Sequence, residues 1–150
     1  MSSITSKDLV LSTMRTYGKA TAQALQEKAP NMTGTELYEE EAFIPDFNPE
    51  RQYLNFKAGY VCKSKAGHVV VLIQPYDSTV YTQQPEELTA QWGFKWSKDP
   101  KKARPFVASA TSPYNTGECC TDEGITYRSK MDNNVYRPKD YQQGWEVVTE

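Results

Sequence analysis

Residues 114–148 read YNTGECCTDEGITYRSKMDNNVYRPKDYQQGWEVV, and this stretch decides how the rest of the chain is interpreted. Short strand-like runs alternate with turn residues along it. Asp122-Glu123-Gly124 separates two such runs, and an acidic residue beside glycine favours the positive φ angles of a β-hairpin turn. Trp145 arrives last, where one large aromatic ring can close a small core. The stretch therefore predicts a compact antiparallel β module.

An earlier part of the chain shows the same outline. Gly59 aligns with Gly117, and in both parts a tryptophan follows seven residues after a proline, as Pro85 and Trp92 and as Pro138 and Trp145. The other matched pairs are Phe56 with Tyr114, Val61 with Cys119, Val70 with Tyr127 and, after a one-residue gap, Gly67 with Gly124. Two copies of one pattern predict a tandem repeat with an insertion in the first copy.

These patterns predict a mainly β fold with an N-terminal helical segment and two small antiparallel β modules in tandem. We expect an N-terminal helical anchor and linker at 1–45, a first module at 46–100 and a second module at 101–150. Aromatic residues make up 12% of the chain and ten of them are tyrosines, which suits half-buried pleated surfaces better than a helical bundle. The run from Val69 to Ile73 is the strongest candidate for a buried strand.

Residues 6 to about 28 carry apolar side chains at spacings of three and four, which predicts a helix that Pro30 ends. Its narrow apolar stripe can pack on the chain's own domain or against copies of itself in an oligomer. If the helix is an anchor, deletion of residues 1–45 should leave the β modules folded.

Thr33 and Glu36 form a capping-box pattern, which predicts a second short helix through about Glu41. The following residues, 42–49, include two prolines and should form an extended linker at a domain boundary. Its apolar side chains, Phe43, Ile44 and Phe47, are expected to dock onto the first module.

Composition restricts the partners and the compartment. The net charge is −2 with a pI near 5.5, which argues against nucleic-acid binding, although residues 95–104 are locally basic. The sequence shows no signal-peptide pattern and no apolar run of the roughly 20 residues that span a bilayer, so we expect no membrane insertion. Three cysteines, two of them adjacent, make no disulfide framework and suggest folding in a reducing cytoplasm.

Catalytic chemistry has little support in the sequence. The chain has one histidine and no glycine-rich phosphate loop, and neither Ser78 nor Ser129 has a base nearby in sequence. The cysteines and His68 match no standard zinc spacing. We therefore expect a protein that is not an enzyme, with no catalytic residue, no metal and no cofactor.

Several aromatic residues are candidates for ligand contact. Tyr76 and Tyr81 lie in a polar loop that is either a plain connection or a recognition surface. Trp96 lies among basic residues that either contact an anionic glycan or form a solvated linker. Tyr136 lies in the second module, where it can bind a ligand or belong to the core. Trp92 and Trp145 are expected to close the cores of their modules.

The second module also resembles a known family. Its motifs are Tyr-Asn-x-Gly at 114–117, Gly-x-x-Tyr-x-Ser at 124–129, Asn134 with Pro138, and Gly-Trp-Glu-x-Val at 144–148. These are similar to repeats of small bacteriophage carbohydrate-binding-like proteins and to the chitin-binding type 3 modules of chitinases and cellulases. The phage versions share this chain's order of a helical segment, an aromatic-proline linker and two modules.

The resemblance implies a virion protein on a tail or head fibre, a homo-oligomer that meets other virion proteins through its N-terminal helix. Such a protein either contacts host-surface polysaccharide or decorates the particle. One feature departs from the family. Sugar rings stack on an aromatic pair four and five residues after the strand tyrosine, and here those positions hold Met131 and Asp132, or Gln74 and Pro75 after Val70. The chain is then either a decoration protein or connector without a sugar site, or a glycan-binding adhesin whose relocated site uses Tyr76, Tyr81, Tyr136 and Trp96.

Overall fold

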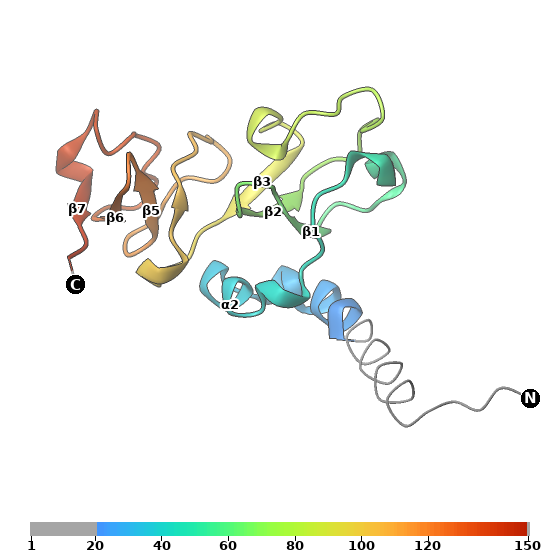
Figure 1. Cartoon of the computed structure of the whole chain (residues 1–150), viewed down its shortest axis with the longest axis horizontal. Coiled ribbons are helices and arrows are strands. Elements are labelled where there is room, and N and C mark those ends of the chain that lie inside the picture. Colours follow the sequence, from blue (N-terminus) through green and yellow to red (C-terminus); the bar gives the residue numbers. More distant parts are fainter. Residues whose placement is uncertain (1–20, 150) are drawn as a thin grey trace, which may run out of the picture.

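The computed structural model describes residues 21–149. The chain is mainly β, with two sheets and a short helix near the N-terminal end, as the sequence predicts (Figure 1). Residues 21–28 are helical. The named helices are η1 (Ala29–Asn31), α2 (Gly34–Glu39), η2 (Glu41–Phe43), η3 (Pro49–Arg51), η4 (Tyr53–Asn55), η5 (Pro85–Glu87), η6 (Pro100–Lys102) and η7 (Gln142–Gly144). The strands are β1 (Val61–Lys63), β2 (Val69–Leu72), β3 (Trp92–Lys95), β4 (Arg104–Pro105), β5 (Cys119–Asp122), β6 (Ile125–Ser129) and β7 (Trp145–Val147).

The two sheets repeat one antiparallel meander. The first has the order β1-β2-β3, and the second has the order β4-β5-β6-β7, with β4 added in parallel beside β5. Val70 pairs with Cys62 in the first sheet, and Tyr127 pairs with Cys120 in the second. A tryptophan begins the third strand of each meander, with Trp92 opposite Leu72 and Trp145 opposite Ser129. We call residues 46–100 the first repeat and residues 101–150 the second repeat.

Glycines take the same backbone conformation at matching places in the two repeats. Gly59 and Gly117, just before the first strand of each meander, have φ of 101° and 94°. Glu123 and Gly124 both have positive φ, at 52° and 81°, in the two-residue turn between β5 and β6. The hairpin turn predicted from the acidic-glycine sequence is confirmed.

A phenylalanine, a tyrosine and a tryptophan pack in the same way in each repeat. Phe47 stacks on Tyr53 with ring centroids 5.5 Å apart, and Phe106 stacks on Tyr114 at 5.4 Å. Each tyrosine meets its tryptophan edge-on, at 5.1 Å for Trp92 and 5.2 Å for Trp145. Each tyrosine hydroxyl also accepts a hydrogen bond from the backbone N–H after the phenylalanine, of Asn48 or of Val107. The internal repeat therefore extends from the strand order to the packing of the aromatic core.

This comparison corrects one pair of the sequence alignment. Tyr53, and not Phe56, has the contacts of Tyr114. The short helix η4 carries Tyr53 into the core, and Phe56 packs edge-on against it at 5.0 Å. The three extra residues between Tyr53 and Gly59 hid the equivalence, because a fixed spacing from the glycine places Phe56 on Tyr114.

The N-terminal part of the described chain packs on the first sheet. Helix α2 begins at Thr33 with the predicted capping box, because Thr33 Oγ1 accepts from Glu36 N and Glu36 Oε1 accepts from Thr33 N. Leu25, Leu37 and Ile44 are buried in one cluster with Val61 and Val69, which confirms that the 42–49 segment docks on the first module. The predicted helix begins at residue 6, and its part up to residue 20 lies outside the described residues.

Residues 95–113 join the two repeats and are not a solvated linker, which was one of the two alternatives for the basic residues around Trp96. Arg104 and Pro105 form β4, and Trp96, Ser97 and Ser109 are buried. Phe94 and Trp96 lie two residues apart, so their side chains leave the same face of the strand and their rings stack at 5.5 Å. Trp96 also stacks on Tyr114, so one continuous aromatic core joins the two repeats.

Candidate functional site

The four candidate aromatic residues divide into two buried and two exposed. Trp96 is 4% exposed and Tyr76 is 8% exposed, whereas Tyr81 is 56% and Tyr136 is 51% exposed. Phe94 and Tyr114 stack against the Trp96 indole, whose Nε1 donates to Ser112 O at 2.8 Å. The Tyr76 hydroxyl accepts from Trp92 Nε1 at 2.8 Å. Both rings serve the core and leave no face for a sugar, which corrects their assignment as ligand-contacting residues.

Tyr136 is half of an aromatic pair at the surface. Its ring lies 4.9 Å from the ring of Tyr141, with the planes inclined by 49°. Tyr141 is partly exposed. The sequence analysis missed Tyr141 because it sits among polar residues with no periodic pattern. Two tyrosine rings side by side form a surface on which a sugar ring can stack, and their hydroxyls can donate and accept hydrogen bonds.

Buried hydrogen bonds fix the backbone that carries Tyr136. The fully buried Asn134 accepts from Tyr136 N through Oδ1 at 3.1 Å, and its Nδ2 donates to Ser129 Oγ at 3.1 Å and to Gly144 O at 3.0 Å. Trp145 Nε1 donates to Tyr136 O at 2.8 Å. The backbone at Tyr136 therefore needs no ordering when a ligand binds.

Gly144 makes room for the second ring. A Cβ atom built on Gly144 would lie 2.9 Å from Tyr141 Cδ2, closer than ordinary contact allows. Only glycine therefore lets Tyr141 lie against the backbone beside Tyr136. In the first repeat the positions nine, four and one residues before Trp92 hold Gln83, Leu88 and Gln91, where the second repeat has Tyr136, Tyr141 and Gly144 before Trp145. The first repeat thus has neither the two rings nor the space between them.

Charged groups lie next to the tyrosine pair. Arg137 donates from Nε and Nη2 to the two carboxylate oxygens of Asp122, at 2.9 Å and 3.0 Å. Lys139 Nζ lies 3.4 Å from Glu123 Oε1. A groove of about 490 Å³ runs between Arg137, the β5–β6 turn and Phe106. Neither Tyr136 nor Tyr141 lines this groove, and Arg137 is the lining residue that follows Tyr136 in the sequence.

Tyr81 lies apart from this pair, on the loop after Tyr76. Asp77 holds the loop, because its Oδ1 accepts from Thr79 Oγ1 at 2.7 Å and from Gln52 Nε2 at 2.9 Å. Gln52 itself has a left-handed backbone with φ of 54°, which is strained for a residue other than glycine. The Tyr81 ring stacks on no other ring within residues 21–149.

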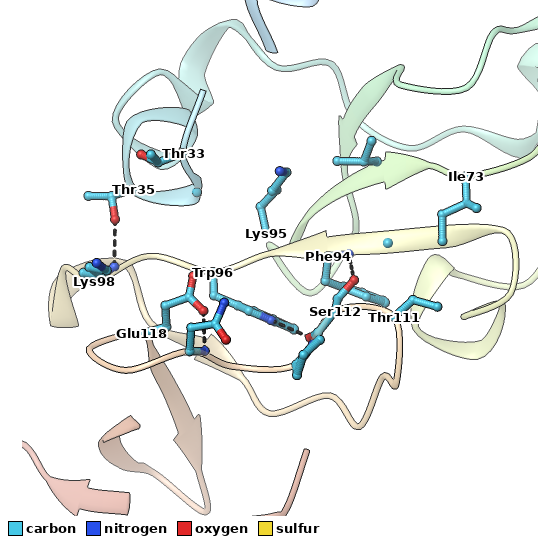
Figure 2. A pocket seen from close by; sticks show the side chains of 15 residues that line it. Thr33, Thr35, Ile73, Phe94, Lys95, Trp96, Lys98, Thr111, Ser112 and Glu118 are labelled. Carbon is cyan, nitrogen blue, oxygen red and sulfur yellow. Dashed lines mark hydrogen bonds between the residues drawn. The ribbon is translucent and has the colours of Figure 1, made fainter. Parts of the chain in front are cut away.

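A second groove, of about 540 Å³, lies where α2 meets both repeats (Figure 2). Lys98 N donates to Thr35 Oγ1 at 3.0 Å, and Phe94 N donates to Ser112 Oγ at 2.8 Å. Lys95, Lys98 and Glu118 are its charged residues. Burial raises the pKa of Glu118 although Asn115 N donates to its carboxylate. Its wall residues are tied up in contacts that join the repeats, so we assign the groove a structural role.

Residues with reactive side chains are buried. Cys62, Cys119 and Cys120 are free thiols inside the cores, and burial raises the pKa of Cys62 to about 12. His68 is 1% exposed, with Nε2 2.5 Å from Pro105 O and Nδ1 3.4 Å from Glu86 Oε2. Across residues 21–149, no cluster of three or more His, Cys, Asp or Glu side chains could hold a metal. Within the same residues no helix has the length and apolar character needed to cross a membrane.

Comparison with known proteins adds no further constraint. No family model matches the chain, and neither a curated protein nor a solved structure is significantly similar to it.

Proposed function

We propose that this protein is a structural or decoration protein of a bacteriophage particle, associated with a tail or head fibre, and that it contacts host-surface glycan through Tyr136 and Tyr141. In this proposal the protein binds and does not catalyse. The first repeat supports the second through the shared aromatic core, and the second repeat carries the glycan site.

The observation that carries the glycan part is the exposed tyrosine pair on a backbone fixed by buried hydrogen bonds. A shallow carbohydrate site gains affinity from a ring held ready in the correct orientation, and Asn134 and Trp145 hold the Tyr136 backbone from both sides. The neighbouring Arg137, whose side chain is 43% exposed, supplies a charged donor for sugar hydroxyls. The family's aromatic pair after the strand tyrosine is absent here. Tyr136 and Tyr141 give the module two adjacent aromatic rings at a different place.

The virion part rests on the resemblance and on the order of segments along the chain. Two repeats with one meander follow an aromatic-proline segment and helical residues, which is the order of the phage proteins that the motifs resemble. In this proposal, attachment to other virion proteins occurs through the N-terminal residues, and several copies on one particle would raise the avidity of a weak site.

Glycan-array binding of the purified protein tests the proposal. Tyr136→Ala should lower the affinity for the best oligosaccharide about tenfold, a typical loss for an anchoring aromatic residue. Tyr136→Phe keeps the ring and should retain most of the binding. Tyr81→Ala, which removes an exposed ring of the first repeat, is the matched control. Equal binding by Tyr136→Ala and by the unaltered protein, both folded, would reject the tyrosine pair as the site.

A second candidate function is a connector that binds no sugar. The burial of Trp96 and Tyr76 favours it, because two of the four candidate rings serve only the core. The lack of any binding by the unaltered protein, alone and attached to particles, would support the connector.

A further inference from the structure

The two repeats contain equivalent grooves beside the hairpin of the meander. One groove, of about 580 Å³, lies in the first repeat, and the other is the groove of about 490 Å³ beside Arg137. The residues that line the two grooves occupy equivalent positions in the strand register and in the turns. The matched pairs are Phe47 with Phe106, Lys63 with Thr121, Ser64 with Asp122, Lys65 with Glu123, Gly67 with Gly124 and Gln84 with Arg137. A cavity that recurs in both repeats is a property of the module.

The same local contacts build both grooves. Phe47 N donates to Lys63 O at 2.8 Å, and Phe106 N donates to Thr121 O at 2.9 Å, so each phenylalanine is held beside the first strand of its meander. In each repeat the residue before the matched proline, Pro85 or Pro138, contacts the hairpin turn. Gln84 Oε1 accepts from Lys65 N at 3.1 Å, and Arg137 binds Asp122.

The charges of the two grooves differ. Lys63, Lys65 and Arg104 outnumber Glu41 and Asp46 along the first groove, whereas Asp122 and Glu123 outnumber Arg137 along the second. The groove of the first repeat is therefore net positive, and the groove of the second repeat, beside Arg137, is net negative. The chain as a whole carries −2, so the positive groove is a local feature.

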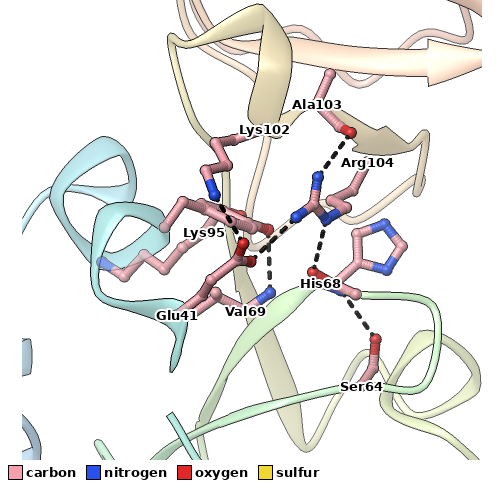
Figure 3. Close-up of polar contacts among 10 residues, drawn as sticks. Glu41, Ser64, His68, Val69, Lys95, Lys102, Ala103 and Arg104 are labelled. Atoms are coloured by element: carbon pink, nitrogen blue, oxygen red, sulfur yellow. Dashed lines mark hydrogen bonds and ion pairs between the residues drawn. The ribbon is translucent and has the colours of Figure 1, made fainter. Parts of the chain in front are cut away.

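Glu41, one of the two acidic residues of the first groove, is held in ion pairs, as Figure 3 shows. Glu41 accepts from Lys102 Nζ at 2.8 Å and from Arg104 Nη2 at 3.0 Å. Although burial would raise the pKa of Glu41, these cations and Lys63 outweigh it and lower the pKa. Lys63 and Lys65 form no ion pair within residues 21–149. Lys65 is exposed and Lys63 is half-buried, so these two ammonium groups face the two carboxylates of the groove, Glu41 and Asp46, with the charge of Glu41 already shared by Lys102 and Arg104.

We propose that the first-repeat groove binds the carboxylate or phosphate groups of an acidic polysaccharide. Lys63 and Lys65 supply the charge, and the Gln84 amide, whose Nε2 has no partner in the described part of the chain, supplies a donor for hydroxyls. Phe47, which is 9% exposed, forms the floor of the groove. This site lies outside the tyrosine pair of the second repeat and does not depend on it.

Calorimetric titration at low salt with oligogalacturonate and with oligo(glycerol phosphate) tests the proposal, and the two probes separate carboxylate from phosphate recognition. Binding of at least one probe is expected, with maltohexaose as the neutral control. The double variant Lys63→Gln, Lys65→Gln should bind about tenfold or more weakly, because charge-assisted hydrogen bonds are lost. The variant Lys57→Gln, Lys130→Gln removes the same charge from exposed positions outside the groove and should bind like the unaltered protein.

The groove beside Arg137 in the second repeat allows a test by gain of binding. Thr121→Lys with Glu123→Lys places the two lysines at equivalent positions, and the stoichiometry should rise from one site to two. Tyr136→Ala should leave the binding of acidic probes unchanged, so this proposal and the glycan proposal can fail separately. The assignment would be overturned if Lys57→Gln, Lys130→Gln lost as much affinity as Lys63→Gln, Lys65→Gln. It would also be overturned if oligoglutamate of the same charge bound as tightly as the acidic saccharide probes. If the unaltered protein binds neither of the two acidic probes, the assignment is also overturned.

Discussion

The Trp96 indole lies flat on the Tyr114 ring, with centroids 4.1 Å apart and planes inclined by 17°. Trp96 follows the last strand of the first sheet, and Tyr114 belongs to the aromatic triad of the second repeat. Cys119 N donates to Ser97 O at 2.9 Å directly beside this stack. One ring of the first repeat is therefore part of the second core, so the stability of each repeat depends on the other.

Trp96→Ala should lower the free energy of unfolding by about 4 kcal/mol, because a buried tryptophan leaves a cavity between the repeats. Urea denaturation, followed by circular dichroism, measures the loss. Trp96→Phe keeps the stack with Tyr114 and loses only the bond from Nε1 to Ser112, so its loss should be smaller. Equal and small losses in both variants would show that the stack contributes little.

Gly144→Ala should weaken glycan binding more than it weakens the fold. The added Cβ lies 2.9 Å from the Tyr141 ring and 3.0 Å from Asn134 Nδ2. The ring can move away at a cost of about 1 to 2 kcal/mol, but it then leaves its place beside Tyr136. Oligosaccharide titration and thermal unfolding of the same variant separate the two effects. Unchanged affinity would mean that Tyr141 is not part of the site.

Glu86 should make the stability of the first repeat sensitive to acid. Burial alone would raise its pKa, but His68, whose Nδ1 lies 3.4 Å from Oε2, and Ser64 together lower the pKa below its usual value. The lowered pKa means that the carboxylate stabilises the fold above the unfolded-state pKa and that this contribution disappears as the pH falls below about 4.5. Thermal unfolding between pH about 6 and 3 should show a steeper loss for the unaltered protein than for Glu86→Gln. Parallel curves would contradict this origin.

Spacing was sufficient to predict the repeat but not its full core. Glycines and tryptophans recur at fixed distances because turn geometry and the strand register fix them, and both features are visible in a sequence. Phe47 and Phe106 are equivalent only in space, since each lies before its meander at a different distance from the next tyrosine. The sequence analysis could not match residues whose equivalence arises from a parallel contact beside β1 or β5.

The candidate site was predicted in part. Tyr136 is exposed and stays a candidate. Tyr76 looked exposed because Asp77, Ser78 and Thr79 follow it, whereas its hydroxyl pairs with the Trp92 indole in the core. The burial of Trp96 was accessible to sequence reasoning, since it lies two residues after Phe94 on the same strand face. The basic residues around it concealed this alternation. Tyr141 had no local signal, because its place depends on Gly144 and on the folding back of the loop.

Leu37→Ala tests whether the helical residues before the first repeat are a separable anchor, as the sequence analysis suggested. Leu37 is 0% exposed and lies in one cluster with Val61 and Val69, and Tyr38 OH donates to Lys95 O and accepts from Val69 N. The substitution should therefore lower the free energy of unfolding by about 3 kcal/mol. Leu54→Ala, at a side chain that is 54% exposed, should cost less than about 0.5 kcal/mol. Equal and small losses in the two variants would restore the anchor interpretation, whereas the expected difference means that deletion of residues 1–45 uncovers Val61 and Val69 and destabilises the first sheet.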